Sequence, residues 1–233
     1  QLLRSFRNWR FFILSLAFPL VLYYSVAGAN RHKQFQGIAF SLGFMAAMMT
    51  LGTMAAVISN CVIIATERST GWTRQMRITP LGTGTYLGAK VLIGSLRAAA
   101  TIAVMCLSGA ALGVRLPASQ WAVMIGLLLA GLVPFTVLGI MLGHLLPADS
   151  GGVAMGGTVT LFALLGGAYG FQVASSGALF DVIKAIPSFW LVQAAKAAIR
   201  LSDWPAEGWI VTAAWTAALI PLAVLAYQRD TRR

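Results

Sequence analysis

The chain has 233 residues, of which 58% are hydrophobic and 10% are charged, and its mean hydropathy is +0.80. Since a soluble domain carries about 25% charged residues, this composition excludes a soluble globular protein, which could not cover its surface in water. The net charge of +11 does not indicate nucleic-acid binding, because the basic residues stand mostly at the ends of apolar runs, as they do beside anionic lipid headgroups.

Six apolar runs are long enough to cross a bilayer, which takes about 20 residues of helix. They predict an all-α integral membrane protein with six transmembrane helices and a single transmembrane domain over residues 1–233. The predicted spans are residues 11–27, 37–65, 87–114, 121–146, 152–173 and 208–227. Pro19 predicts a kink in the first span, and Pro134 and Pro221 lie inside the fourth and the sixth.

Residues 1–10 and the first span can each be interpreted in two ways. Residues 1–10 form either a short interfacial helix, with Leu2, Phe6 and Trp9 on one side, or only the charged flank of the first span. The first span with the small residues 27–29 also resembles a signal peptide with its cleavage site. The signal peptide is the weaker alternative, because the apolar run is long for one.

Residues 174–207 form the longest connection, which is semi-polar and precedes the sixth span. Its piece from Phe189 to Arg200 is too short and too charged to cross a bilayer. We therefore expect an amphipathic helix at the surface, within a re-entrant or interfacial segment. Such a segment can gate an exit, or its aromatic residues can simply anchor it at the membrane interface.

The distribution of basic residues predicts the orientation of the chain. The side that holds both termini and residues 66–86 has nine arginines, and the other side has six Lys and Arg residues together with Asp181, Asp203 and Glu207. Cytoplasmic loops carry an excess of Lys and Arg. Both termini and the loop of residues 66–86 are therefore predicted to be cytoplasmic.

Signatures of an enzyme are absent from the sequence. The predicted spans contain no Asp or Glu, and His32 and His144 are isolated, without a second ligand at metal spacing. The segment from Gly84 to Lys90 comes nearest to a phosphate-binding loop, but its spacing is wrong and Val91 stands where Ser or Thr would hold Mg²⁺. We expect no enzyme activity, metal or cofactor on this chain.

The loop between the second and third spans carries the most information. Residues 66–86 read TERSTGWTRQMRITPLGTGTY, and a short helix can run from about Trp72 to Ile78, before Pro80. The loop resembles the cytoplasmic signature of type-2 ATP-binding-cassette transporter permeases, most closely of small bacterial drug, antibiotic or lipid exporters. The matching residues are Glu67, Arg68, Gly71, Arg74, Gln75, Met76, Arg77, Pro80 and Leu81. The alternative is a solvated basic loop that only follows the charge rule for cytoplasmic segments.

The resemblance implies the fold, the partners and the mechanism. The chain would be a permease subunit in the bacterial plasma membrane, paired with a second copy of itself or with a paralogous permease. Separate ATPase subunits would bind ATP and Mg, and export of a hydrophobic or amphipathic substrate would follow when they push on the loop, called the coupling helix. The residues implied in coupling to the ATPase are Glu67, Arg68, Gly71, Trp72, Arg74, Arg77 and Pro80.

Two charges near the loop have a further predicted role. Glu67 stands where the long second span meets the loop, and we expect it to anchor the loop through Arg97 or Arg68. Arg97 lies about ten residues into the third span. Since a charge at the bilayer centre costs about 2.5–3.5 kcal/mol on insertion scales, Arg97 is expected to reach toward the cytoplasm or to face a polar interior.

The translocation path is predicted from the second and fifth spans, which the resemblance implies near the dimer axis. Methionine adapts to varied apolar ligands, and the second span is rich in it. The candidate path residues are Met45, Met49, Thr53, Asn60, Thr158, Phe162, Leu165, Tyr169 and Gln172. Ordinary helix packing is the alternative for each of them, and the glycines of the fifth span indicate close helix approach.

Three other functions compete with that of an exporter subunit. An ATP-independent channel or carrier would transport without any partner. A membrane protein of assembly or signalling would stimulate no ATPase and carry no substrate. An intramembrane enzyme is the weakest alternative, because no catalytic constellation is present in the sequence.

Overall fold

The protein is described by a computed structural model over residues 9–30, 33–35, 38–70, 83–170, 174, 176–200 and 202–231. Its helices are α2 (Trp9–Leu22), α3 (Phe40–Ile58), α4 (Asn60–Ser69), α6 (Thr83–Ala111), α7 (Ala118–Gly131), α8 (Val133–Leu145), α9 (Ala148–Gly166), α10 (Ala178–Lys184), α11 (Pro187–Arg200) and α12 (Ala206–Thr231). A π-helical segment, η2 (Tyr23–Ala27), continues α2, and the two-residue strands β1 (Gln34–Phe35) and β2 (Ile38–Ala39) pair antiparallel.

The fold is a bundle of long apolar helices, as expected for an all-α integral membrane protein. Within the described residues, five helical stretches are long and apolar enough to cross a membrane, or six if the bent pair α10 and α11 counts as one span. Five of the six predicted spans correspond to these stretches: α3 with α4, α6, α7 with α8, α9, and α12. The first predicted span forms α2 with η2, whose apolar part, Leu16–Ala27, is shorter than the other five stretches. The helical form satisfies the backbone hydrogen bonds where lipid offers no partner.

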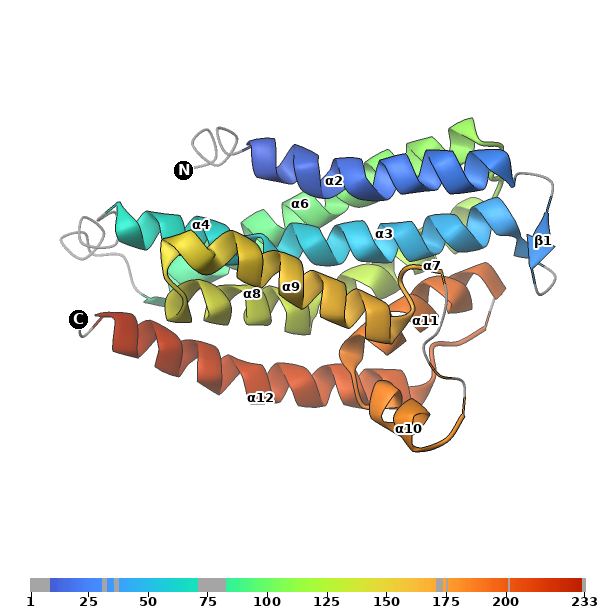
Figure 1. Ribbon diagram of the computed structural model, residues 1–233. Helices are drawn as coiled ribbons and strands as arrows, with labels where there is room; N and C mark the ends of the chain where they lie inside the picture. Colours follow the sequence, from blue (N-terminus) through green and yellow to red (C-terminus); the bar gives the residue numbers. More distant parts are fainter. Residues whose placement is uncertain are drawn as a thin grey trace.

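Alternate helices of the bundle run in opposite directions (Figure 1). The starts of α2, α6 and α9 lie at the same end as the ends of α4, α8 and α12 (Figure 1). The end of α4 and the start of α6, which flank the loop in the sequence, therefore lie at the end where the described chain both begins and finishes (Figure 1). This end is called the loop end below, and its cytoplasmic orientation stays a prediction from the charges.

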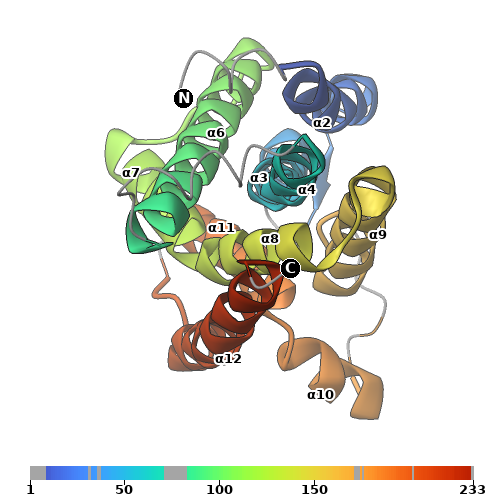
Figure 2. The same ribbon diagram turned by 90° about the vertical axis from the view of Figure 1, so that its left-hand side faces the viewer.

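The second span is the centre of the bundle. Figure 2 shows α3 and α4 surrounded by α2, α6, α8 and α9, and 89% of the span's most apolar window is buried inside the chain. The span bends at Ser59, which separates α3 from α4 and donates a hydrogen bond from Oγ to the Ala56 carbonyl oxygen at 2.6 Å. Movement of α4 would therefore be transmitted directly to α8 and α9, which pack against it, and through α3 to the rest of the bundle.

The observed helix bounds depart from the predicted spans in consistent ways. α4 continues to Ser69 and α12 to Thr231, because a helix can extend into the headgroup region beyond its apolar part. α6 begins at Thr83, four residues before the predicted start. The helices therefore contain acidic residues beyond the predicted spans, since Glu67 lies in α4 and Asp230 in α12. Pro134 stands at the start of α8, where it interrupts the fourth span.

The segment before the last span differs from the prediction. α10 and α11 meet at 77°, which agrees with a re-entrant segment. However, α11 is not a surface helix: it packs against α7, α9 and α3, and Trp190 and Leu191 are buried. Indole N–H groups hold this corner together, since Trp190 donates to the Lys184 carbonyl oxygen at 2.6 Å and Trp204 donates to that of Trp190 at 3.1 Å. α11 is buried despite its few charged residues because neighbouring helices cover its apolar side chains.

Glycines of α8 allow it to lie directly against the central span. A Cβ atom added at Gly139 would lie 3.0 Å from the Ile58 Cα atom, and one added at Gly143 would lie 2.7 Å from the Ile64 Cβ atom. Small residues are the usual means of close helix approach in membranes, where packing rather than the hydrophobic effect holds helices together. These contacts fix α4 against α8 next to the loop end.

Candidate functional site

An ion pair joins the two helices that flank the loop. Lys90 of α6 donates from Nζ to both carboxylate oxygens of Glu67 of α4, at 2.6 Å each. Tyr86, one turn nearer the loop on α6, donates from its hydroxyl to Glu67 Oε2 at 3.3 Å. The Lys90 side chain is 7% exposed and that of Glu67 is 26% exposed. The part of a helix that lies at the loop end is called its foot below. The foot of α4 and the foot of α6 are thereby fixed to each other.

The basic residue that forms the ion pair with Glu67 is Lys90 and neither of the two predicted candidates, Arg97 and Arg68. Arg97 is seven residues further along α6 than Lys90, which places it about 10 Å deeper in the bundle. Its Nη1 atom donates to Ser59 Oγ at 3.3 Å, at the bend between α3 and α4. Arg97 thus faces a polar position in the interior, as expected for an intramembrane charge.

Asn60 adds a third contact between α4 and α6. Its amide Nδ2 donates to the Lys90 carbonyl oxygen at 3.2 Å. A Cβ atom at position 94 of α6 would lie 2.7 Å from this amide nitrogen, so Gly94 makes the space that Asn60 occupies. Asn60 was predicted to line a path, and here it is buried and holds two helices together.

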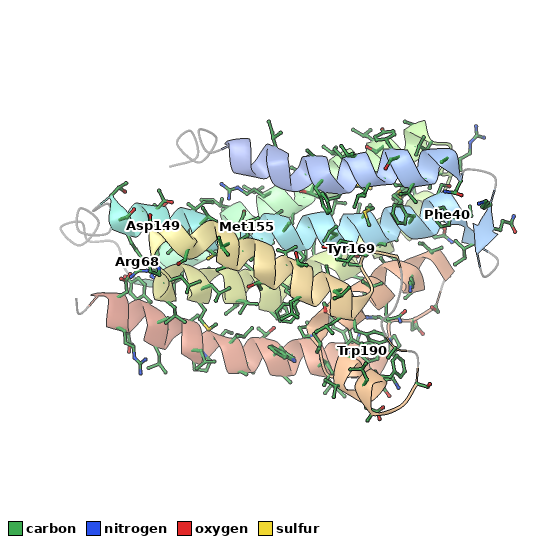
Figure 3. All side chains as sticks on the ribbon, viewed as in Figure 1. Phe40, Arg68, Asp149, Met155, Tyr169 and Trp190 are labelled. Carbon is green, nitrogen blue, oxygen red and sulfur yellow. The ribbon has the colours of Figure 1, made fainter. Side chains whose placement is uncertain are left out.

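Arg68 points to the other side of α4. Its Nε atom lies 2.7 Å from Asp230 Oδ1 of α12, and its Nη1 atom donates to the carbonyl oxygens of Gly143 and Leu146 at 3.2 and 3.0 Å. Successive residues of a helix point about 100° apart, which is why the adjacent residues Glu67 and Arg68 reach different helices. Figure 3 shows Arg68 at the loop end, opposite to Phe40.

The structure brings only part of the predicted coupling set into view. Glu67 and Arg68 lie in α4. The other members lie outside the described residues, within positions 71–82, and their role stays a prediction: Gly71, Trp72, Arg74, Arg77 and Pro80.

The predicted path residues of the second span are enclosed within the chain. Met45, Met49 and Thr53 are fully buried in the core cluster around α3. The Thr53 hydroxyl donates within its own helix, to the Met49 carbonyl oxygen at 2.8 Å. This placement favours packing for these side chains in the single chain, and their contact with a substrate stays a prediction.

Thr158, Phe162 and Leu165 lie in α9, and Tyr169 follows its end. Phe162 packs edge-to-face on Phe135 and Trp215, at ring-centroid distances of 5.4 and 6.2 Å. Thr158, Leu165 and Tyr169 are half-buried. Gln172 lies outside the described residues, and no metal-binding group of three His, Cys, Asp or Glu side chains occurs among those described.

Sequence reasoning missed Lys90 and Tyr86 as parts of this site. Both fall in the segment that was examined for a phosphate-binding loop, and their spacing of four residues puts them on one face of a helix. The sequence contained a usable signal. A lysine inside a span needs an acidic partner, and Glu67 at the end of the preceding span is the nearest acidic residue to Lys90.

Comparison with known proteins agrees with this arrangement. The sequence profile of the ABC-2 type transporter family matches residues 1–199. A Bacillus subtilis (strain 168) protein, provisionally named transport permease YvfS, is 29% identical over 170 residues, which cover 72% of this chain and 69% of that protein. With its multi-pass helical bundle and its paired helix feet around the loop, the chain belongs to the ABC-2 type transporter family and is a membrane transport permease.

Proposed function

We propose that this chain is the membrane-spanning subunit of an ATP-binding-cassette exporter in the bacterial plasma membrane. It would move a hydrophobic or amphipathic substrate, such as a drug, an antibiotic or a lipid. ATP and Mg would bind to a separate ATPase subunit. The observation that carries the proposal is the Glu67–Lys90 ion pair, with two oxygens at 2.6 Å, because it ties together both helices that flank the loop.

The paired feet would let the loop act as a lever on the bundle. A force on a loop between two independent helices would be lost in relative motion of those helices, whereas α4 and α6 joined at Glu67 and Lys90 would move as one body. α4 is continuous with the central helix α3 except for the bend at Ser59. Movement at the loop end would thus reach the packed centre of the molecule.

A hollow at the opposite end suits an amphipathic substrate. The outer ends of α3, α9 and α11 line it, with the stacked rings of Phe40 and Phe44 at a centroid distance of 5.6 Å and with the cation of Lys196. Apolar rings beside one basic group match a substrate that has an apolar body and an acidic or polar head. We propose that the path includes this hollow, with the methionine-rich face of α3 exposed to it only in another state of the cycle.

We also propose that α9 meets a second permease, either another copy of this chain or a paralogous one. Only 11% of the most apolar window of α9 is buried inside the chain. Its outer face carries Gly152 and Gly156 at the four-residue spacing that lets two membrane helices approach closely, and neither has a neighbour within 4 Å of an added Cβ atom.

A cross-linking experiment tests this pairing. In a variant with Cys61 and Cys106 replaced by alanine, Gly156→Cys is expected to form a disulfide-linked dimer in membranes, because the two helices would cross near that position. Val123→Cys on α7, exposed but on another face, serves as the control and should stay monomeric. Equal behaviour of the two variants would refute the α9 interface between copies, unless a paralogous permease co-purifies and cross-links in place of the second copy.

Purification from native membranes tests the exporter proposal itself. The tagged chain is expected to bring down an ATP-binding-cassette ATPase.

Arg74→Glu should leave the protein inserted and the ATP turnover near the wild-type rate, while transport of rhodamine 6G or of a fluorescent phospholipid falls about tenfold. Arg115→Glu, in the loop at the opposite end of the bundle, is the control. Recovery without an ATPase, together with transport by the chain alone in liposomes, would favour an ATP-independent channel or carrier instead.

A further inference from the structure

A second ion pair at the loop end involves residues that the coupling prediction did not contain. Asp230, in the last turn of α12, receives Arg68 Nε on Oδ1 at 2.7 Å and lies 3.1 Å from His144 Nδ1 through Oδ2. Because a carboxylate only accepts hydrogen bonds, the Nδ1 atom of His144 is assigned as the donor. One carboxylate thus holds a side chain of α4 and a side chain of α8.

Arg68 completes the connection between the same three helices. Its Nη1 atom donates to the carbonyl oxygens of Gly143 and Leu146, at the C-terminal end of α8. The last carbonyls of a helix have no partner within the helix and carry partial negative charge, so a guanidinium group there is favourable. Arg68, Asp230 and His144 form a closed set of contacts among α4, α8 and α12, which we call the clasp.

Aromatic rings connect the clasp to the Glu67–Lys90 pair. Tyr227 of α12 lies edge-to-face on His144 at a centroid distance of 5.2 Å, and Tyr86 lies 6.0 Å from Tyr227. Tyr86 is the residue that donates to Glu67. The feet of four helices, α4, α6, α8 and α12, are therefore held in one network at the loop end.

The polar side chains of the clasp are largely buried, so each of them is favourable only while its partners are present. The side chains of Arg68, Asp230 and His144 are 23%, 14% and 0% exposed. Removing one partner of a largely buried pair leaves the other charge without compensation, which costs more than the pair contributes. The clasp is thus a specific arrangement whose loss should loosen the foot of α4.

We propose that Asp230 is a positioning residue that acts through Arg68 to hold the foot of α4, where the loop begins, and to make the last span part of the coupling apparatus. The inference rests on the proposed exporter function for its second half. α12 packs along α8 and reaches the outer corner of the molecule, where Trp215 donates to the Ala185 carbonyl oxygen at 2.8 Å. A displacement of the loop would therefore travel by α12 to the opposite end, in parallel with the central span.

The first experiment measures the opening of the foot of α4 without any ATPase. In inverted membrane vesicles, trypsin cleavage after Arg68, in the last turn of α4, requires the foot of α4 to open locally. Asp230→Asn keeps the size of the side chain but removes its charge, and it should raise the cleavage rate about tenfold, because cleavage follows the population of the open form. Asp230→Glu should restore a rate close to that of the wild type.

The matched control is Arg229→Gln, which removes an exposed charge from the neighbouring position of α12. It should leave cleavage after Arg68 unchanged. Should Asp230→Asn reduce the amount of inserted protein, the double exchange Arg68→Asp with Asp230→Arg keeps both charges. Because it removes the trypsin site at position 68, the opening of α4 is then measured by hydrogen exchange, which should be slower in the double exchange than in Arg68→Asp alone. Equal cleavage of the wild type and of Asp230→Asn would overturn the clasp.

The second experiment measures coupling in the complex with its ATPase. A dye on Leu179→Cys of α10, at the opposite end, should change its emission when vanadate traps the ATPase, and Asp230→Asn should reduce this change several-fold while ATP turnover persists. A normal change in Asp230→Asn would overturn the coupling role. If the wild-type complex itself gives no response, the exporter proposal fails, while the cleavage experiment still decides whether the clasp holds the foot of α4.

Discussion

Replacing Glu67 with alanine is expected to uncouple the ATPase from the permease almost completely. The change leaves Lys90 buried without its partner, and it removes the joint between α4 and α6. Breaking a fully buried ion pair costs about 3–5 kcal/mol, and the quarter exposure of Glu67 points to the lower end of that range. The dye response on α10 in the trapped complex should fall about tenfold, while ATP turnover stays within about twofold of the wild type.

Two further variants decide whether the ion pair is responsible. The double exchange Glu67→Lys with Lys90→Glu keeps one charge of each sign at the joint and should recover part of the response. Glu207→Ala removes an exposed carboxylate at the start of α12, at the opposite end from the loop, and should behave as the wild type. A full response in Glu67→Ala, with the protein normally inserted, would remove the basis for coupling through this joint.

Replacing Gly143 with valine is expected to have the largest effect on folding. A Cβ atom at this position would lie 2.7 Å from the Ile64 Cβ atom and 3.0 Å from the Cys61 carbonyl oxygen. α8 would have to move away from α4, and the overpacking should destabilise the protein by about 3 kcal/mol. In detergent, the midpoint of thermal unfolding is expected to fall by about 10 °C, as measured by the loss of the monodisperse peak in size-exclusion chromatography.

Gly126→Val is the matched control for that experiment. Gly126 lies on the exposed face of α7, and an added Cβ atom there has no neighbour within 4 Å. The same change of residue type should then shift the midpoint little, since only the helix propensity and the lipid contact change. Similar midpoints for Gly143→Val and Gly126→Val would mean that the close approach of α4 and α8 does not limit stability.

The spans of this protein were predictable because the hydropathy of a long segment indicates whether water or lipid surrounds it. Each apolar run had to become a helix in lipid, where unpaired backbone groups are too costly. Pro134, which lies inside the fourth predicted span, stands where α7 ends and α8 begins, and the local reason is that proline lacks the backbone N–H group. The acidic residue that ends the second span was also apparent, and with the loop sequence it led to the transporter family.

Pairing between distant residues was not predictable in the same way. The sequence suggested Arg97 or Arg68 for Glu67, yet a rotation of about 100° per residue along α4 and α6 selects Lys90. Asp230 lies 162 positions from Arg68, and nothing in the local sequence connects them. The burial of α11 was likewise missed, because its apolar face needs α7 to cover it.

Local composition therefore accounts for which segments form long apolar helices and for where the loop between the second and third spans lies in the sequence. The tertiary arrangement decided that α3 and α4 occupy the centre, that the feet of four helices meet beside the loop, and which charge pairs with which. The physical reason is that insertion into lipid depends on each segment alone, whereas close packing and charge pairing depend on how helices from distant parts of the chain face one another.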